Sequence, residues 1–139
     1  MHSPILTPVV LLAAWSMVMW AWMYVMRLPA IRRSKMRLDP NAARGEQMAM
    51  LPPRVRWKAD NYNHLMEQPT VFYATAIALA LLGHGDGWAM RLAWTYLALR
   101  VLHSFVQALW NRIEVRFSIF ALSSFALIGM VGIALRVVL

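Results

Sequence analysis

The chain alternates long apolar segments with shorter polar ones. The apolar segments are residues 5–26, 62–83, 88–109 and 116–138. A helix of about 20 residues crosses roughly 30 Å of hydrocarbon, so each segment is long enough to span a membrane. Because a helix satisfies its own backbone polar groups, we expect all four to be helical. The pattern predicts one all-α membrane domain over residues 1–139, built as a bundle of four transmembrane helices.

The longest polar segment follows the first apolar one and predicts a loop over about 27–53. Nine of the fourteen Lys and Arg residues lie in or just after it: Arg27, Arg32, Arg33, Lys35, Arg37, Arg44, Arg54, Arg56 and Lys58. Basic loops face the cytoplasm, so both termini are expected on the other side. In a bacterium this multi-pass protein would lie in the inner membrane, because apolar helical spans do not suit the outer one.

Two proline positions predict where the second helix starts and bends. Pro52-Pro53 ends the loop, and Pro suits a first helical turn because its missing N–H has no helical partner there. Pro69 lies inside the second apolar segment and cannot donate to the carbonyl of Leu65. We therefore expect a helix from about Arg54 to about Leu82, with a kink or a polar contact at Pro69.

Composition narrows the possible chemistry. The chain has no Cys, so any thiol that reacts must come from a ligand. The net charge of +8 sits between apolar segments rather than in a soluble basic patch, so no nucleic-acid partner is expected. His103 has no second His or Cys on a neighbouring turn, so a hydrogen-bonding role is expected and no metal site.

Polar side chains in and next to the second and third apolar segments recur at helical spacing. In the second, the spacings are four, three and four residues: Arg56, Asp60, Asn63 and Glu67. In the third, they are three, four and four: Arg100, His103, Gln107 and Asn111. Each set therefore shares one helical face. An ionisable group in a bilayer costs at least about 2.5 kcal/mol, so such stripes are expected to face protein or water and to be functional.

Two interpretations of the stripes are open. In the first, the stripes meet, Glu67 pairs with Arg100, and the amides bond across helices. In the second, the polar residues near the cytoplasmic end form a cationic pocket for an anionic ligand. Arg112 and Glu114 are expected at its solvated rim.

The same residues resemble a known family. Residues 60–73 are similar to the second-helix motif of bacterial MAPEG proteins, small membrane proteins of eicosanoid and glutathione metabolism. There an Asn and a Glu precede a Pro and an aromatic residue. A second set of residues in this chain resembles the family's third-helix motif and the arginine that opens its fourth helix: Arg100, His103, Ser104, Gln107, Asn111 and Arg116. The resemblance covers nearly the whole chain.

The resemblance implies a homotrimer, embedded in lipid, that binds glutathione as co-substrate between adjacent subunits. The residues implied to hold or line the glutathione site are Arg56, Asn63, His64, Glu67, Arg100, His103, Gln107 and Asn111. Asn63 and His64 are alternatives for the motif's Asn. Arg116 would be the catalytic residue, because a guanidinium within hydrogen-bond distance lowers a thiol's pKa and stabilises the thiolate.

Three functions are weighed on this basis. The first is a glutathione-dependent transferase or peroxidase acting on lipophilic small molecules. The alternative is a non-catalytic lipid-binding or scaffold member, like the family's lipoxygenase-activating protein. A third is a small proton-coupled exporter, but those carry their Glu in the first span and here Glu67 is in the second. Gln107 and Phe120 stand where the family's prostaglandin and leukotriene synthases have tyrosines, so the substrate stays open.

Overall fold

The computed structural model describes residues 3–139, and all the regular structure in that range is helical. Its helices are α1 (Leu6–Ser34), α2 (Glu46–Ala49), α3 (Pro53–Leu65), α4 (Pro69–Leu81), α5 (Gly87–Phe105), the π-helical turn η1 (Val106–Trp110) and α6 (Ile113–Val138). No strand occurs between residues 3 and 139. The predicted all-α class is confirmed.

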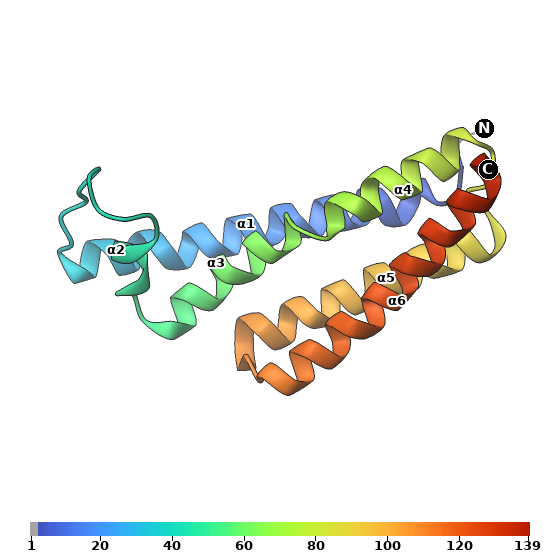
Figure 1. Ribbon diagram of the computed structural model, residues 1–139. Helices are drawn as coiled ribbons and strands as arrows, with labels where there is room; N and C mark the ends of the chain where they lie inside the picture. The colour runs from blue at the N-terminus through green and yellow to red at the C-terminus, as the bar shows by residue number, and fades with distance from the viewer. Residues whose placement is uncertain (1–2) are drawn as a thin grey trace.

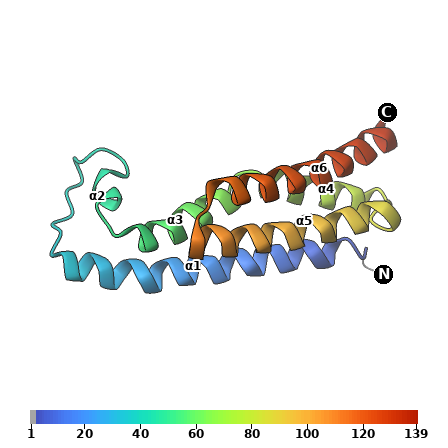
Figure 2. The ribbon, with the colours of Figure 1, turned by 90° about the horizontal axis from the view of Figure 1, so that it is seen from below.

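The long helices lie lengthwise beside one another. α1 packs against α3, and α5 packs against α6 along most of its length. α3 and α4 follow each other in nearly one line, and both chain ends lie at the end of the molecule opposite α2 (Figure 1). Figure 2, seen from below, shows α1 and α5 side by side with α6 above them. Leu12, Met19 and Met130 are fully buried in the shared core, where the rings of Phe72 and Tyr96 stack at 4.6 Å.

Two of the helices, α1 and α6, are long and apolar enough to cross a membrane. The outer surface of the chain is rich in large apolar side chains, and on α6 Phe117, Phe125 and Ile128 are 68, 69 and 63% exposed. Such a surface is typical of contact with lipid or with another chain. The other two spans, the bounds of the loop and the side on which it lies remain predictions.

The second predicted helix is broken at the place where Pro69 predicts a kink. α3 ends at Leu65 and α4 begins at Pro69, which takes the first-turn position. At the break the Glu67 amide donates to the carbonyl of His64 over a long distance, 3.4 Å. The Nη2 of Arg100 donates to the same carbonyl at 3.1 Å. Arg100 thus satisfies a backbone group that the break leaves short of partners.

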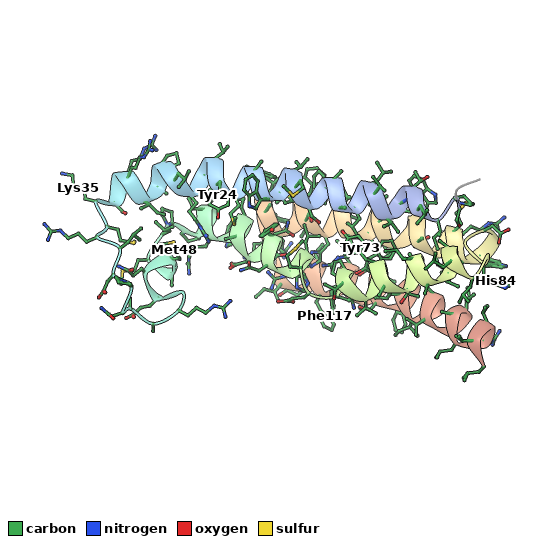
Figure 3. All side chains as sticks on the ribbon, turned by 90° about the horizontal axis from the view of Figure 1, so that it is seen from above. Tyr24, Lys35, Met48, Tyr73, His84 and Phe117 are labelled. Carbon is green, nitrogen blue, oxygen red and sulfur yellow. The ribbon has the colours of Figure 1, made fainter. Side chains whose placement is uncertain are left out.

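The polar segment between α1 and α3 folds over the end of the molecule. Figure 3 shows Lys35 and Met48 at that end and His84 at the other. Gln47 holds the fold, because its Nε2 donates to the carbonyl of Arg37 at 2.7 Å and its Oε1 accepts from the amide of Asp39 at 3.0 Å. The segment that carries α2 is therefore placed above the start of α3.

Candidate functional site

The polar stripe of α3 faces away from the core of the chain. Asp60, Asn63 and Glu67 are exposed, and the side chain of Glu67 is 67% exposed. The buried face of α3 carries Asn61 and Leu65 instead. The four-residue and three-residue spacings place Arg56, Asp60 and Asn63 on one side of α3. Glu67 lies beyond the end of that helix, in the break before α4.

The stripe of the third segment faces inward. Arg100, His103 and Gln107 are 0, 2 and 5% exposed. The two stripes thus do not meet, and the predicted pairing of Glu67 with Arg100 is wrong for residues 3–139. The carboxylate Oε2 of Glu67 contacts the Nδ1 of His64 at 3.0 Å. Arg100 is kept from that carboxylate because it turns to the backbone at the α3–α4 break.

A first hollow, of about 170 Å³, opens between the end of α3, α5 and α6. It is lined by His64, His103, Ile113, Arg116, Phe117 and Phe120, and we call it the imidazole hollow. The ring centroids of His64 and His103 are 5.0 Å apart, and those of His64 and Phe120 are 5.3 Å apart. Phe117, labelled in Figure 3, lies on α6 near its start. The hollow combines two imidazoles and a guanidinium with apolar walls.

The guanidinium in this hollow is held by the turn that precedes α6. Asn111 follows η1 with a φ of 53°, a left-handed conformation that Asn tolerates better than most residues. Its amide closes the wide turn by donating to the carbonyl of Val106 at 2.6 Å. Its side-chain Oδ1 accepts a hydrogen bond from the Nη1 of Arg116 at 2.7 Å. The irregular turn therefore fixes one end of the Arg116 guanidinium.

A second hollow, of about 360 Å³, lies under the polar loop. It is lined by Arg27, Arg44, Gly45, Met48, Ala49, Arg56, Ala59, Asp60 and Asn63, and we call it the arginine hollow. Three guanidinium groups reach it from α1, the loop and α3. The Nε atoms of Arg27 and Arg56 are buried and have no hydrogen-bond partner within residues 3–139. Unpaired buried donors of positive charge favour an anionic ligand here.

Comparison with protein families gives one match, to the model of the MAPEG family over residues 5–136. That match covers almost the entire sequence. The chain belongs to the MAPEG family. No curated protein and no solved structure was found to match it. MAPEG members include glutathione transferases and peroxidases and eicosanoid-related proteins, they commonly use glutathione, and they are generally trimeric membrane proteins.

The predicted MAPEG site residues fall into three groups in the single chain. Arg56 and Asn63 line the arginine hollow, whereas His64, His103 and Arg116 line the imidazole hollow. A third group lines neither: Glu67, Arg100, Gln107 and Asn111. Asn63 and His64, the two alternatives for the family's Asn, thus open to different hollows because consecutive helical residues point about 100° apart.

Sequence reasoning missed two of the three arginines of the arginine hollow, Arg27 and Arg44. Both belong to the basic loop region, where charge was taken as a sign of membrane topology. Lys58, counted with the same basic residues, is only 5% exposed, and its Nζ lies 5.4 Å from the centre of the Trp22 ring. Burial, with a smaller effect of Arg54, lowers the pKa of Lys58 below its usual 10.5. Within residues 3–139 no three His, Cys, Asp or Glu residues are grouped to hold a metal ion.

Proposed function

We propose that this MAPEG protein is a glutathione-dependent transferase or peroxidase that acts on lipophilic electrophiles in the membrane. The observation that carries the proposal is Arg116, whose guanidinium is held by Asn111 at 2.7 Å and lines a hollow with two imidazoles and two Phe rings. A fixed guanidinium in apolar surroundings stabilises a thiolate strongly, because little water screens the charge. Arg116 is the proposed catalytic residue.

The arginine hollow supports glutathione as the thiol. Glutathione carries two carboxylates and one ammonium group. Arg27, Arg44 and Arg56 offer forked donors that match carboxylates, and Asp60 in the same hollow would accept from the ammonium. Asn63 adds an amide that can bond to the peptide backbone of the ligand.

A homotrimer would bring the two kinds of hollow together. In one chain, Arg116 and the three arginines line separate hollows. We propose that the arginine hollow of one subunit lies next to the imidazole hollow of its neighbour, so that the tripeptide bridges them. If the organism is bacterial, the trimer would lie in the inner membrane, with the hollows toward the cytoplasm and the termini on the other side.

In the proposed reaction, the sulfur of glutathione loses its proton and the thiolate lies beside Arg116. The thiolate then attacks an electrophilic carbon of the lipophilic substrate, and a carbon–sulfur bond forms as the leaving group departs with its electron pair. With a hydroperoxide, the sulfur attacks the outer oxygen, and a sulfur–oxygen bond forms as the oxygen–oxygen bond breaks. The alkoxide leaves and takes up a proton to become the alcohol, and a second glutathione converts the resulting sulfenic acid to the disulfide and water. Ile113, Phe117 and Phe120 supply the apolar walls against which such a substrate would lie.

A groove between α4 and α6 favours a second candidate function, lipid binding without catalysis. It encloses about 410 Å³ and is lined by Gln68, Val71, Ser124, Leu127, Ile128, Val131, Gly132 and Leu135. Only one end is polar, where the Nε2 of Gln68 donates to the Oγ of Ser124 at 2.8 Å. An apolar groove with one polar end suits an acyl chain with a small headgroup.

The test combines calorimetric titration of glutathione with a conjugation assay on a generic aromatic electrophile. We expect the wild-type protein in detergent to bind glutathione and to form the conjugate. Arg116→Ala should bind glutathione and lose most of the turnover, with its oligomeric state unchanged. Absence of binding at millimolar glutathione would overturn the enzyme proposal and leave lipid binding as the better candidate.

A further inference from the structure

His64 and Glu67 form a pair that the family resemblance does not assign as a unit. The Nδ1 of His64 and the Oε2 of Glu67 are 3.0 Å apart. An ionised carboxylate only accepts hydrogen bonds, so Nδ1 must carry the proton of the neutral ring. The lone pair is then on Nε2. The pair has the arrangement of a base whose orientation and tautomer are set by a carboxylate.

The position of His64 puts this base beside the proposed thiolate site. Its ring lines the imidazole hollow together with Arg116, and 27% of the side chain is exposed. His103 lines the same hollow but is only 2% exposed. The ring of His64 lies beside both His103 and Phe120, at centroid distances of 5.0 and 5.3 Å. Of the two imidazoles, His64 is therefore the accessible one.

We propose that His64 is the general base that removes the proton from the glutathione thiol, with Glu67 as its positioning residue. This inference rests on the proposed function. Formation of the thiolate is then divided between two residues, because His64 would take the proton while Arg116 would stabilise the sulfur anion. A guanidinium cannot remove the thiol proton, since it stays protonated in proteins.

The S–H bond of glutathione breaks, the proton moves to Nε2 of His64, and the electron pair stays on sulfur beside Arg116. The imidazolium is stabilised by the carboxylate of Glu67 at Nδ1. The thiolate forms the carbon–sulfur bond, and the proton on Nε2 passes to the departing group or to water. His64 is then neutral again, and no further reactant is needed.

The charged groups around His64 come from three elements. Glu67 follows it along the chain, Arg100 and His103 face it from α5, and Arg116 faces it from α6. Arg100 donates to the backbone carbonyl of His64, and this hydrogen bond holds its guanidinium close to the ring. Two guanidinium groups favour the neutral ring that a base requires, and Glu67 offsets the charge once the ring is protonated.

The experiment measures the pH dependence of kcat/KM for conjugation in four variants of the full chain. His64→Gln keeps a polar side chain and removes the base, and Glu67→Gln removes the carboxylate. His64→Ala is assayed with and without added imidazole. His84→Gln is the matched control, because His84 is exposed at the opposite end of the molecule (Figure 3). Calorimetric titration of glutathione into each variant shows whether the binding site is retained.

We expect His64→Gln to lose about 100-fold in kcat/KM near pH 7, the usual contribution of a general base, and Glu67→Gln about 10-fold. The loss should shrink as the pH rises above about 8.5, where a free thiol ionises unaided. Imidazole should restore part of the activity of His64→Ala. His84→Gln should match the wild type.

Three results overturn the proposal, and they are distinguishable. If His64→Gln and Glu67→Gln bind glutathione and keep the wild-type rate and pH profile, His64 is not the base, while the proposed function stands. If the wild-type protein neither binds glutathione nor forms a conjugate, the proposed function fails and the base assignment fails with it. A rate loss in His64→Ala that imidazole does not restore, and that is equal at every pH, also rejects the base.

Discussion

Asn111 accepts a hydrogen bond from Arg116 across the start of α6, and the distance from Oδ1 to Nη1 is 2.7 Å. The acceptor lies in a left-handed turn and the donor in the first turns of a regular helix. The contact therefore depends on the backbone of the turn as well as on the amide. It assigns Asn111 a positioning role toward Arg116, whereas the family resemblance grouped it with the glutathione-holding residues.

Replacing Asn111 by Gly should distinguish the contribution of the turn's backbone from that of the Asn111 side chain. Gly adopts a positive φ without strain, so the turn and the fold should persist. Loss of one hydrogen bond to a charged group costs about 1.5 to 3 kcal/mol, so kcat/KM for conjugation should fall about 10-fold or more, with KM for glutathione little changed. Arg112→Gln, which removes the neighbouring exposed guanidinium, should stay near the wild-type rate. Equal rates in Asn111→Gly and wild type would exclude the positioning role.

Arg27 and Arg44 should contribute to glutathione affinity. Each lines the arginine hollow, and Arg27 has a buried Nε without a partner. Calorimetry should show a Kd about 10-fold higher for Arg27→Gln and for Arg44→Gln, because each variant loses a charge-assisted contact to a carboxylate. The control is Lys35→Gln, which removes a charge from the exposed end of the same loop (Figure 3). A Kd raised equally in all three variants would indicate general electrostatic attraction rather than a defined site.

Arg100 should matter for the stability of the fold. Its side chain is fully buried, and its Nη2 satisfies the carbonyl of His64 at the break between α3 and α4. Arg100→Ala leaves a cavity and an unsatisfied carbonyl, for which we expect a loss of about 3 kcal/mol in the free energy of unfolding. Arg91→Ala on the exposed face of α5 should change it by less than about 0.5 kcal/mol. Thermal unfolding in detergent measures both, and similar midpoints for the two variants would contradict the prediction.

Gly85 should not tolerate a side chain. A Cβ at this position would overlap Ser3 and lie 2.7 Å from Cγ2 of Ile5, and the Gly85 carbonyl accepts the Ile5 amide at 3.1 Å. Gly85→Ala should therefore lower the free energy of unfolding by about 1 to 3 kcal/mol. Gly132→Ala in α6 has open space around its Cβ and should be neutral or stabilising by up to about 1 kcal/mol. The comparison uses the same unfolding assay, and an unaffected Gly85→Ala would show that the N-terminal contact is dispensable.

The sequence predicts the helical class and the break at Pro69 well, because both depend on local chemistry. It also predicts that Asp60 and Asn63 share a face of α3. It does not predict which way that face points, because rotation of a helix about its axis is decided by packing along its whole length. In α3 the buried positions include Asn61, a residue that polarity alone would place outside.

The arginine hollow shows a second limit of sequence reasoning. Arg27 ends the first apolar segment, Arg44 lies in the loop and Arg56 lies in α3, so no spacing rule connects them. They come together because the loop folds back over the start of α3. Long-range contacts made by a loop leave no periodic pattern in the sequence.

The π-helical turn over Val106–Trp110 has a consequence for comparing this chain with its relatives. Such a turn contains one residue more than an α-helical turn, so the chain leaves the end of this helix at Asn111 rotated by about 100° relative to an uninterrupted helix. In a relative without the turn, the distance along the sequence from the equivalent of His103 to the equivalent of Arg116 would be shorter by one. Alignments of this segment therefore need a gap inside the helix, and deletion of a single residue there should reorient Arg116 without changing its chemistry.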